Sequence, residues 1–240
     1  LHFPQLALEV FNPAPETPLV VEQTEQQRRA VLFASTAAQQ AGVTPGMSIP
    51  SAYGMCDHLQ VRVRDPGLEQ KTLQRIALIG YQFTPHLALV GDDQLLLEIE
   101  TSLRLFGGCD ALLATLQKAL GEEALSCAIA CFPTAKGAMV LARCAVPPGS
   151  AEIFPLEALD TCPLSATDLP TTQVTRLQGM GLQSLGQLFA LPGAALGKRF
   201  GQATLFYLQQ LRGLLPDLRP HYELPAQFES NFELGHETQQ

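Results

Sequence analysis

Short apolar runs with strand and helix periods alternate along the first 165 residues of the chain. Strands are predicted where apolar and polar residues alternate or where a short apolar run lies between turn residues, and helices where apolar residues recur every three to four positions. Strands are expected at residues 1–10, 19–22, 29–35, 87–90, 94–99 and 124–132, and helices at 36–41, 68–83, 109–120 and 134–144, with one more helix after residue 47. This interleaving predicts an α+β fold with a mixed β-sheet.

Turn residues mark a central hairpin and the end of the β-rich part. Gly91-Asp92-Asp93 separates two apolar runs, which indicates a tight hairpin. From Pro163 onward, Gly and Pro break the pattern into short helices, expected at residues 182–191, 194–200 and 203–211. We predict a separate helical module there. Residues 222–240 carry several glutamates and scattered aromatics, and are expected to be a linker or a strand without its partner.

The composition is that of a globular protein. Apolar residues make up 46% of the chain and charged residues 16%, which excludes a disordered chain. No apolar run reaches the roughly 18 residues that a bilayer requires, and the first residues do not form a secretory signal, so a soluble, cytoplasmic protein is expected. The chain starts inside an apolar pattern and ends in a polar tail, which predicts a fragment of a longer protein.

The net charge of −8 argues against avid, sequence-independent binding to nucleic acid. The charge is unevenly distributed, however. Residues 1–169 hold ten Lys or Arg against eighteen Asp or Glu, whereas residues 170–220 hold five Lys or Arg against Asp217 as the sole acid. If any part of the chain contacts DNA, we expect it to be this later part.

The cysteines and histidines give no metal-binding or redox signature. None of the six cysteines belongs to a Cys-x-x-Cys pair, and Cys127 and Cys131 fall on a predicted buried strand, where core thiols are the simplest interpretation. The histidines His2, His58, His86, His221 and His236 lie far apart in sequence without metal-ligand spacing, so no role is assigned to them.

Several local strings occur in an order that is typical of one enzyme family. They are Ala34-Ser35, Gly42-Val43 and Gly46-Met47; then Gly91-Asp92-Asp93-Gln94 with Leu97-Glu98; then Leu185-Gly186-Gln187-Leu188, Arg199-Phe200-Gly201 and Arg212-Gly213. Their order and spacing resemble the fingers, palm hairpin and thumb of the Y-family DNA polymerases, and more closely the catalytically silent ImuB-type members of the bacterial mutasome. The resemblance implies a palm at 1–10 and 68–165, small fingers at 11–67, an all-helical thumb with a helix-hairpin-helix-like element at 166–221, and a linker at 222–240 toward an absent little-finger domain.

The resemblance also identifies the positions where catalysis would occur. In the family, two aspartates on the first strand and an Asp-Glu pair in the palm hairpin hold two magnesium ions, which require anionic oxygen ligands. The corresponding residues here are Pro4, Leu6, Asp93 and Gln94, and residues 1–49 contain no aspartate. We therefore expect no catalytic residue, no metal and no cofactor.

The family's contacts to the nucleotide triphosphate are replaced in the same way. The tyrosine and arginine of the fingers correspond to Thr36 and Gln39, and the palm lysine corresponds to Val146, followed by the retained Pro147. None of the three supplies the positive charge that stabilises a transferring phosphoryl group. No nucleotide site is expected.

Two groups of charged residues admit both a functional and a simpler interpretation. Asp92, Asp93, Glu98 and Glu100 could form a carboxylate cluster, but the simpler interpretation is preferred: two turn residues, and two residues on a solvated strand face. The candidate DNA contacts in the thumb are Thr171, Thr172, Arg176, Lys198, Arg199 and Arg212. Lys198 and Arg199 could instead be cations favoured at a helix C-terminus.

The resemblance implies a non-catalytic subunit in SOS-induced translesion synthesis, associated with primer-template DNA. Its implied partners are the sliding clamp, a RecA-like accessory protein and an error-prone polymerase, bound mostly through regions absent here. One alternative is a degenerate but active polymerase in which Asp93, Glu98 and Glu9 rebuild a metal site. A further alternative is a scaffold that binds proteins only.

Overall fold

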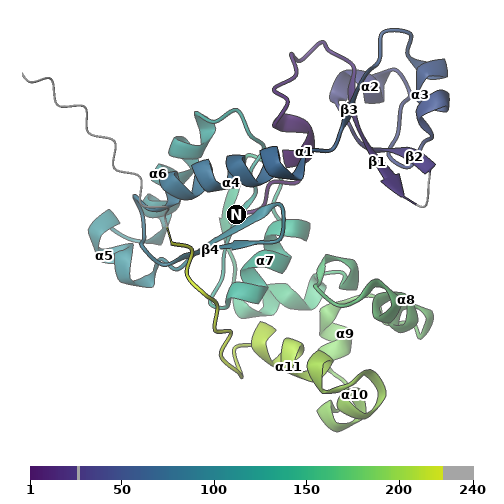
Figure 1. The fold of residues 1–240 in the computed structure, drawn as a ribbon. Coiled ribbons are helices and arrows are strands. Elements are labelled where there is room, and N and C mark those ends of the chain that lie inside the picture. Colours follow the sequence, from purple (N-terminus) through teal and green to yellow (C-terminus); the bar gives the residue numbers. More distant parts are fainter. Residues whose placement is uncertain (26–27, 224–240) are drawn as a thin grey trace, which may run out of the picture.

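The fold was analysed in a computed structural model that describes residues 1–25 and 28–223 (Figure 1). It is an α+β fold with mixed strand order, as the apolar pattern predicts. The described side chains form two large apolar cores and two smaller ones. Among the helices of these residues, none combines the length and apolar character needed to cross a bilayer.

The segment predicted as fingers, residues 11–67 and called the fingers below, contains a three-stranded sheet and two short helices. Its elements are β1 (Leu19–Glu25), β2 (Arg28–Ala34), β3 (Gln60–Val63), α2 (Thr36–Gln40) and α3 (Ile49–Met55). The strand order is β2-β1-β3, with β1 antiparallel to β2 and parallel to β3. Ser35 and Ser48 cap α2 and α3 by accepting a hydrogen bond from the backbone N–H three residues later.

The segments predicted as palm, residues 1–10 and 68–165 and called the palm below, contain two strand pairs joined by the first residues of the chain. Its strands are β4 (Leu87–Val90), β5 (Gln94–Leu97), β6 (Ile129–Cys131) and β7 (Ala151–Ile153), and its helices are α4 (Pro66–Gly80), α5 (Leu103–Phe106), α6 (Cys109–Gly121) and α7 (Ala135–Cys144). The pair β4–β5 is antiparallel and β6–β7 is parallel. His2 bridges to both Gln94 and Ala128 and so connects the two pairs.

The helices that follow share a core with the palm. They are α8 (Thr171–Gly179), α9 (Leu185–Phe189), α10 (Gly193–Phe200) and α11 (Gln202–Leu211), preceded by the 3₁₀ turns Leu156–Thr161 and Leu164–Ala166. Leu177, Leu185 and Leu211 pack in one buried cluster with Val140 and Leu141 of α7. Burial of the helices in the predicted thumb therefore involves α7, and the predicted division into modules stays a prediction. Figure 1 shows α9 and α11 below α7.

The first ten residues do not form the predicted strand. Beyond the bridge at His2, Pro4 supplies no N–H for further pairing, and α1 (Leu6–Glu9) begins two residues later. Leu6, Ala7 and Leu8 are all buried, because α1 lies among the palm, β1 and β2. The alternation of Leu6, Leu8 and Val10 therefore does not indicate two faces of a strand.

Other boundaries differ from the prediction because short strands carry little periodic signal. The strand expected at 124–132 is reduced to Ile129–Cys131, and the helix expected at 182–191 is reduced to Leu185–Phe189. The strands β3 and β7 are absent from the prediction. Both hold exposed residues, including Val63 and Ile153, and pair at an edge.

The segment after α11 runs back along the palm. The N–H of Tyr222 donates to the main-chain oxygen of Leu87 over 2.8 Å. The hydroxyl of Tyr81 donates to the main-chain oxygen of Tyr222 over 2.5 Å. Lys136 of α7 pairs with Asp217 at 3.4 Å. The remainder of the predicted linker, residues 224–240, lies outside the described residues.

Two glycines provide a matched test of packing. A Cβ at Gly186 would lie 2.8 Å from the main-chain oxygen of Asp160, whereas a Cβ at Gly54 would meet no atom within 4 Å. We expect Gly186→Ala to lower the free energy of unfolding by about 1–3 kcal/mol through overpacking. Gly54→Ala should leave it unchanged or raise it by up to about 1 kcal/mol. Urea unfolding measures both, and equal effects would contradict the close contact between α9 and the turn at Asp160.

Candidate functional site

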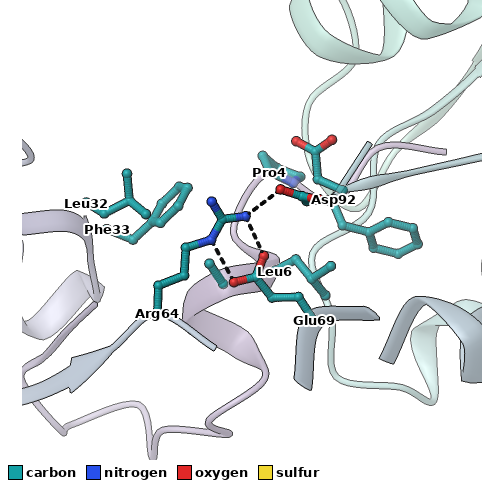
Figure 2. A pocket seen from close by; sticks show the side chains of 10 residues that line it. Pro4, Leu6, Leu32, Phe33, Arg64, Glu69 and Asp92 are labelled. Carbon is teal, nitrogen blue, oxygen red and sulfur yellow. Dashed lines mark hydrogen bonds and ion pairs between the residues drawn. The ribbon is translucent and has the colours of Figure 1, made fainter. Parts of the chain in front are cut away.

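A cleft of about 280 Å³ lies where the N-terminal segment, the fingers and the palm hairpin meet (Figure 2). Its lining comprises Phe3, Pro4, Leu6, Ala7, Leu32, Phe33, Arg64, Glu69, Asp92 and Asp93. Three of the four positions that the family resemblance associates with catalysis, Pro4, Leu6 and Asp93, therefore lie in one place. The fourth, Gln94, is directed away from the cleft into the palm.

The polar part of the cleft is an ion cluster of Arg64, Glu69 and Asp92, here called the Arg64 cluster. The guanidinium of Arg64 donates to both carboxylate oxygens of Glu69, over 2.9 and 2.7 Å, and to Asp92 over 2.8 Å. The hydrogen bond to Glu69 raises the pKa of Arg64 above its usual value. The Glu69 side chain is 3% exposed, and Asp92 is 67% exposed. The cluster joins β3 of the fingers to α4 and to the palm hairpin.

The residues at the four assigned positions do not form a set of anionic ligands. Pro4 and Leu6 have no side-chain oxygen. Asp93 lies in the β4–β5 turn with its carboxylate 3.4 Å from Nε2 of His2, and its side chain is 47% exposed. Gln94, at the first position of β5, is 1% exposed and contributes a neutral amide.

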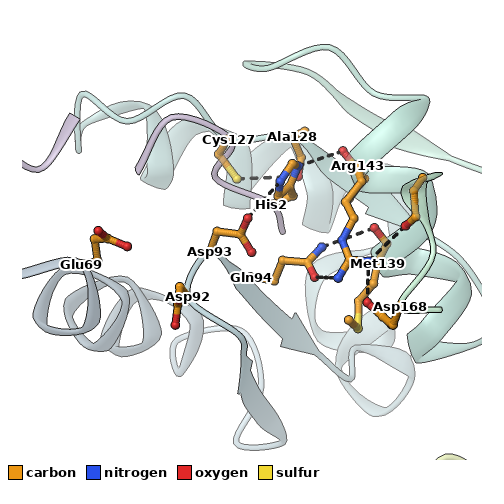
Figure 3. A network of polar contacts seen from close by, with 12 residues as sticks. His2, Glu69, Asp92, Asp93, Gln94, Cys127, Ala128, Met139, Arg143 and Asp168 are labelled. Atoms are coloured by element: carbon orange, nitrogen blue, oxygen red, sulfur yellow. Dashed lines mark hydrogen bonds and ion pairs between the residues drawn. The ribbon is translucent and has the colours of Figure 1, made fainter. Parts of the chain in front are cut away.

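The Gln94 amide belongs to a network between the palm and the thumb (Figure 3). Its oxygen accepts from Nη2 of Arg143 over 2.6 Å, and its nitrogen donates to the main-chain oxygen of Met139 over 3.3 Å. Arg143 also donates through Nη1 to the main-chain oxygen of Ala166 over 3.0 Å and to the carboxylate of Asp168 over 2.6 Å. We call Gln94, Arg143 and Asp168, with Tyr207, the palm–thumb network.

Tyr207 of α11 extends this network into the thumb. Its hydroxyl oxygen accepts from the N–H of Asp168 over 2.9 Å, and burial raises the pKa of the phenol. Lys136 of α7 lies 5.3 Å from the centre of its ring. At the start of α7, Thr134 donates to the main-chain oxygen of Leu211 over 2.9 Å. Polar contacts therefore attach both ends of α7 to the thumb.

The cleft does not fit a pair of magnesium ions. Magnesium takes hard oxygen ligands in octahedral geometry. In the part of the chain that the structure describes, no three His, Cys, Asp or Glu side chains converge into a possible metal site. Glu9 is engaged elsewhere, because its carboxylate accepts the N–H of Ser126 over 3.1 and 3.0 Å. Glu98 follows the far end of β5, so Glu9, Asp93 and Glu98 do not come together.

The three nucleotide-clamp positions offer no cation. Thr36 is an exposed first residue of α2, and Gln39 donates to the main-chain oxygen of Ala34 over 2.8 Å. Val146 is 7% exposed and belongs to the shared core of palm and thumb. Gln39 and Val146 are thus engaged in local structure.

The candidate DNA contacts of the thumb are all exposed and fall into separate groups. Arg176 and Arg199 are 23 residues apart in sequence, but both guanidinium groups lie over the ring of Phe200, at 5.5 and 6.0 Å from its centre. Arg212 lies 5.4 Å from the centre of Phe189 instead. Thr171 and Thr172 begin α8, where backbone N–H groups face solvent. Lys198 is in the last turn of α10.

The sequence prediction missed Arg64, Glu69, Arg143 and Asp168, although two of them had a signal. Glu69 lies on the helical face that holds Leu73 and Ile76, at spacings of four and seven residues, and a charge on an apolar face indicates a buried partner. Arg143 follows the buried Met139 by four residues on α7. Neither signal identifies the partner, because the pattern along one helix does not show which side chain outside it packs against it: Arg64 precedes α4, five residues before Glu69, and Gln94 is 49 residues from Arg143.

Comparison with solved structures defines the class of fold. The chain superposes on DinB from Sulfolobus solfataricus with a TM-score of 0.66 and 20% identity, covering 89% of this chain and 65% of that one. For the Dbh DNA polymerase in an insertion ternary complex the TM-score is 0.69 and the identity 20%, covering 89% of this chain and 66% of that one. For a Y-family DNA polymerase chimera of Dbh the TM-score is 0.68 and the identity 20%, covering 89% of this chain and 66% of that one. The fold is thus that of the Y-family DNA polymerases.

The chain belongs to the impB/mucB/samB family, whose model matches residues 2–145. It is 32% identical to the ImuB protein of Caulobacter vibrioides over 177 residues, which are 72% of this chain and 38% of that protein. It is 26% identical to DNA polymerase IV of Dehalococcoides mccartyi over 223 residues, 90% of this chain and 56% of that one. The chain is therefore an ImuB-like homologue and spans between a third and about half of the length of these relatives.

Proposed function

We propose that the chain is part of a non-catalytic, DNA-associated subunit of translesion synthesis. The observation that carries this proposal is the amide of Gln94. By the family resemblance it corresponds to the second hairpin carboxylate, and it is buried and hydrogen-bonded to Arg143. An amide held by a guanidinium cannot supply the negative charge that two-metal phosphoryl transfer requires.

The Arg64 cluster supports the same proposal. Glu69 and Asp92 are the carboxylates in the cleft besides Asp93, and both already accept hydrogen bonds from Arg64. A metal ion that recruited them would have to displace the guanidinium and leave it without its partners. Glu69 and Asp92 are thus committed to joining fingers and palm.

A primer-extension assay tests the proposal. With magnesium or manganese, the chain should incorporate no nucleotide, and Gln94→Glu should not restore incorporation, because the new carboxylate would pair with Arg143. Asp93→Ala should leave this baseline unchanged. Incorporation that disappears on Asp93→Ala would establish the alternative, a degenerate but active polymerase.

DNA association is proposed through the exposed cations of the thumb. We expect Arg176→Ala and Arg199→Ala each to weaken binding to primer-template DNA and to reduce the slope of log affinity against log salt by about 1, because each removes one phosphate contact. Arg104→Ala is the matched control, since Arg104 is an exposed cation on α5 of the palm. Fluorescence anisotropy at several salt concentrations measures both quantities. Absence of binding to primer-template DNA even at low salt would support a scaffold that binds proteins only.

The proposed role includes recruitment of partners by the complete protein. From the family resemblance we expect the sliding clamp, a RecA-like accessory protein and an error-prone polymerase to be those partners. Co-purification of each with the complete protein tests this part separately from the chemistry of the cleft. Failure of all three to co-purify would contradict it.

A further inference from the structure

We propose that Cys109 and Cys131 form an oxidant-reactive dithiol site that closes to a disulfide in the folded protein. The two sulfur atoms lie 3.5 Å apart. Cys109 is the first residue of α6, and Cys131 is the last residue of β6. They are 22 residues apart in sequence, without a spacing motif, so the pair is created by the packing of helix against sheet.

Small oxidants can reach both thiols. Cys109 and Cys131 are each half-buried, and both line a groove of about 770 Å³ in the palm, which also contacts Phe132 and Leu218. A peroxide molecule is far smaller than this groove. By contrast, Cys127 is buried, and its thiol lies 3.8 Å from the main-chain oxygen of Ala128.

The backbone around Cys109 permits the sulfur atoms to approach. A disulfide has a sulfur–sulfur distance of about 2.05 Å, so the pair must close by about 1.5 Å. Gly107 and Gly108 immediately precede Cys109 and have φ values of +79° and +117°. Because glycine tolerates these and neighbouring conformations at little cost, the first turn of α6 can shift with a rotation of the side chain.

The chemistry assigns different roles to the two sulfurs. Burial, and next the hydrogen bond with Cys109, raise the pKa of Cys131 to about 12, so Cys131 stays protonated and Cys109 is the sulfur that reacts first. The Cys109 sulfur, as thiolate, attacks hydrogen peroxide, breaks the O–O bond and releases hydroxide, which takes up a proton to form water. The resulting sulfenic acid is attacked by the Cys131 sulfur. The S–S bond forms as hydroxide leaves with the Cys131 proton as a second water molecule.

The rival pair in the chain is Cys144 and Cys162. A hydrogen bond from Cys162 lowers the pKa of Cys144, which is exposed, but Cys162 is buried at 2% exposure. A tryptic digest distinguishes the two possible disulfides. Lys118 divides Cys109, in residues 105–118, from Cys131, in residues 119–136, whereas Cys144 and Cys162 share residues 144–176.

The experiment treats the native protein with hydrogen peroxide, alkylates the remaining thiols after denaturation, and maps tryptic peptides by mass. We expect peptides 105–118 and 119–136 to be linked, with fragmentation placing the bond at Cys131 rather than Cys127. The linkage should persist in Cys144→Ser and be lost in both Cys109→Ser and Cys131→Ser. Prior treatment with phenylarsine oxide, which captures closely spaced dithiols, should prevent it.

Three outcomes would overturn the proposal. One is recovery of both peptides alkylated at Cys109 and Cys131, the second is linkage of Cys109 to Cys127, and the third is a bond between Cys144 and Cys162 alone. Circular dichroism of each serine variant checks that it is folded. If one variant does not fold, the other variant and the phenylarsine oxide protection still decide the result.

Discussion

Arg143→Ala is expected to lower the free energy of unfolding by about 3 kcal/mol. The substitution leaves the buried oxygen of Gln94 without its donor and removes the bonds to Ala166 and Asp168. A buried polar group without a partner costs about 1–3 kcal/mol, and hydrogen bonds to charged groups contribute about 1.5–3 kcal/mol each. The contribution of Asp168 is the smaller part, because its side chain is 36% exposed.

Urea unfolding followed by circular dichroism measures this loss. The matched control is Lys118→Ala on α6, an exposed cation whose removal should change stability by less than about 0.5 kcal/mol. Gln94→Leu in the Arg143→Ala background should recover part of the loss, because it removes the orphaned amide. A loss below about 1 kcal/mol for Arg143→Ala would show that the palm–thumb network adds little to stability.

The palm–thumb network also links stability to the geometry of the proposed DNA surface. Arg143 fixes Asp168, the N–H of Asp168 bonds Tyr207 of α11, and Thr204 of α11 donates to Gln173 of α8 over 2.9 Å. The thumb cations on α8 and α10 are therefore oriented from a residue in the palm. Gln94, at the first position of β5, therefore supports the placement of these helices through Arg143.

The fold was predictable where long elements carry a clear period. Apolar residues at 73, 76 and 77 predict α4, and the pattern at 112, 113, 116 and 120 predicts α6; all seven are buried. The Gly91-Asp92-Asp93 turn sets the β4–β5 hairpin as expected. The prediction failed for residues 1–10, where burial on several sides of α1 imitates the alternation of a strand.

The sequence predicted which residues of the candidate site lack negative charge, but not which side chains they contact. Side-chain chemistry alone shows that Pro4, Leu6 and Gln94 supply no negative charge. Which cations approach them depends on tertiary packing, since Arg64 arrives from the fingers and Arg143 from α7. The dithiol of Cys109 and Cys131 was missed for the same reason, because a helix start and a strand end meet only in the folded chain.

The second large effect is expected at the Arg64 cluster. Arg64→Ala should lower the free energy of unfolding by about 2–4 kcal/mol, because it leaves the carboxylate of Glu69 buried without its bidentate partner. This expected loss is smaller than for a fully buried ion pair because the Arg64 side chain is 26% exposed. Asp92→Ala, which removes the exposed member of the cluster, should cost less than about 1 kcal/mol.

A double-mutant cycle separates the ion pair from the loss of packing. Glu69→Leu alone leaves Arg64 with Asp92 and access to solvent, so we expect it to cost less than Arg64→Ala. In the combined variant no charge remains buried, and the two effects should be non-additive by about 2 kcal/mol. Additive losses would mean that Glu69 and Arg64 stabilise the fold independently, and the carboxylates of the cleft would then be free to act as metal ligands.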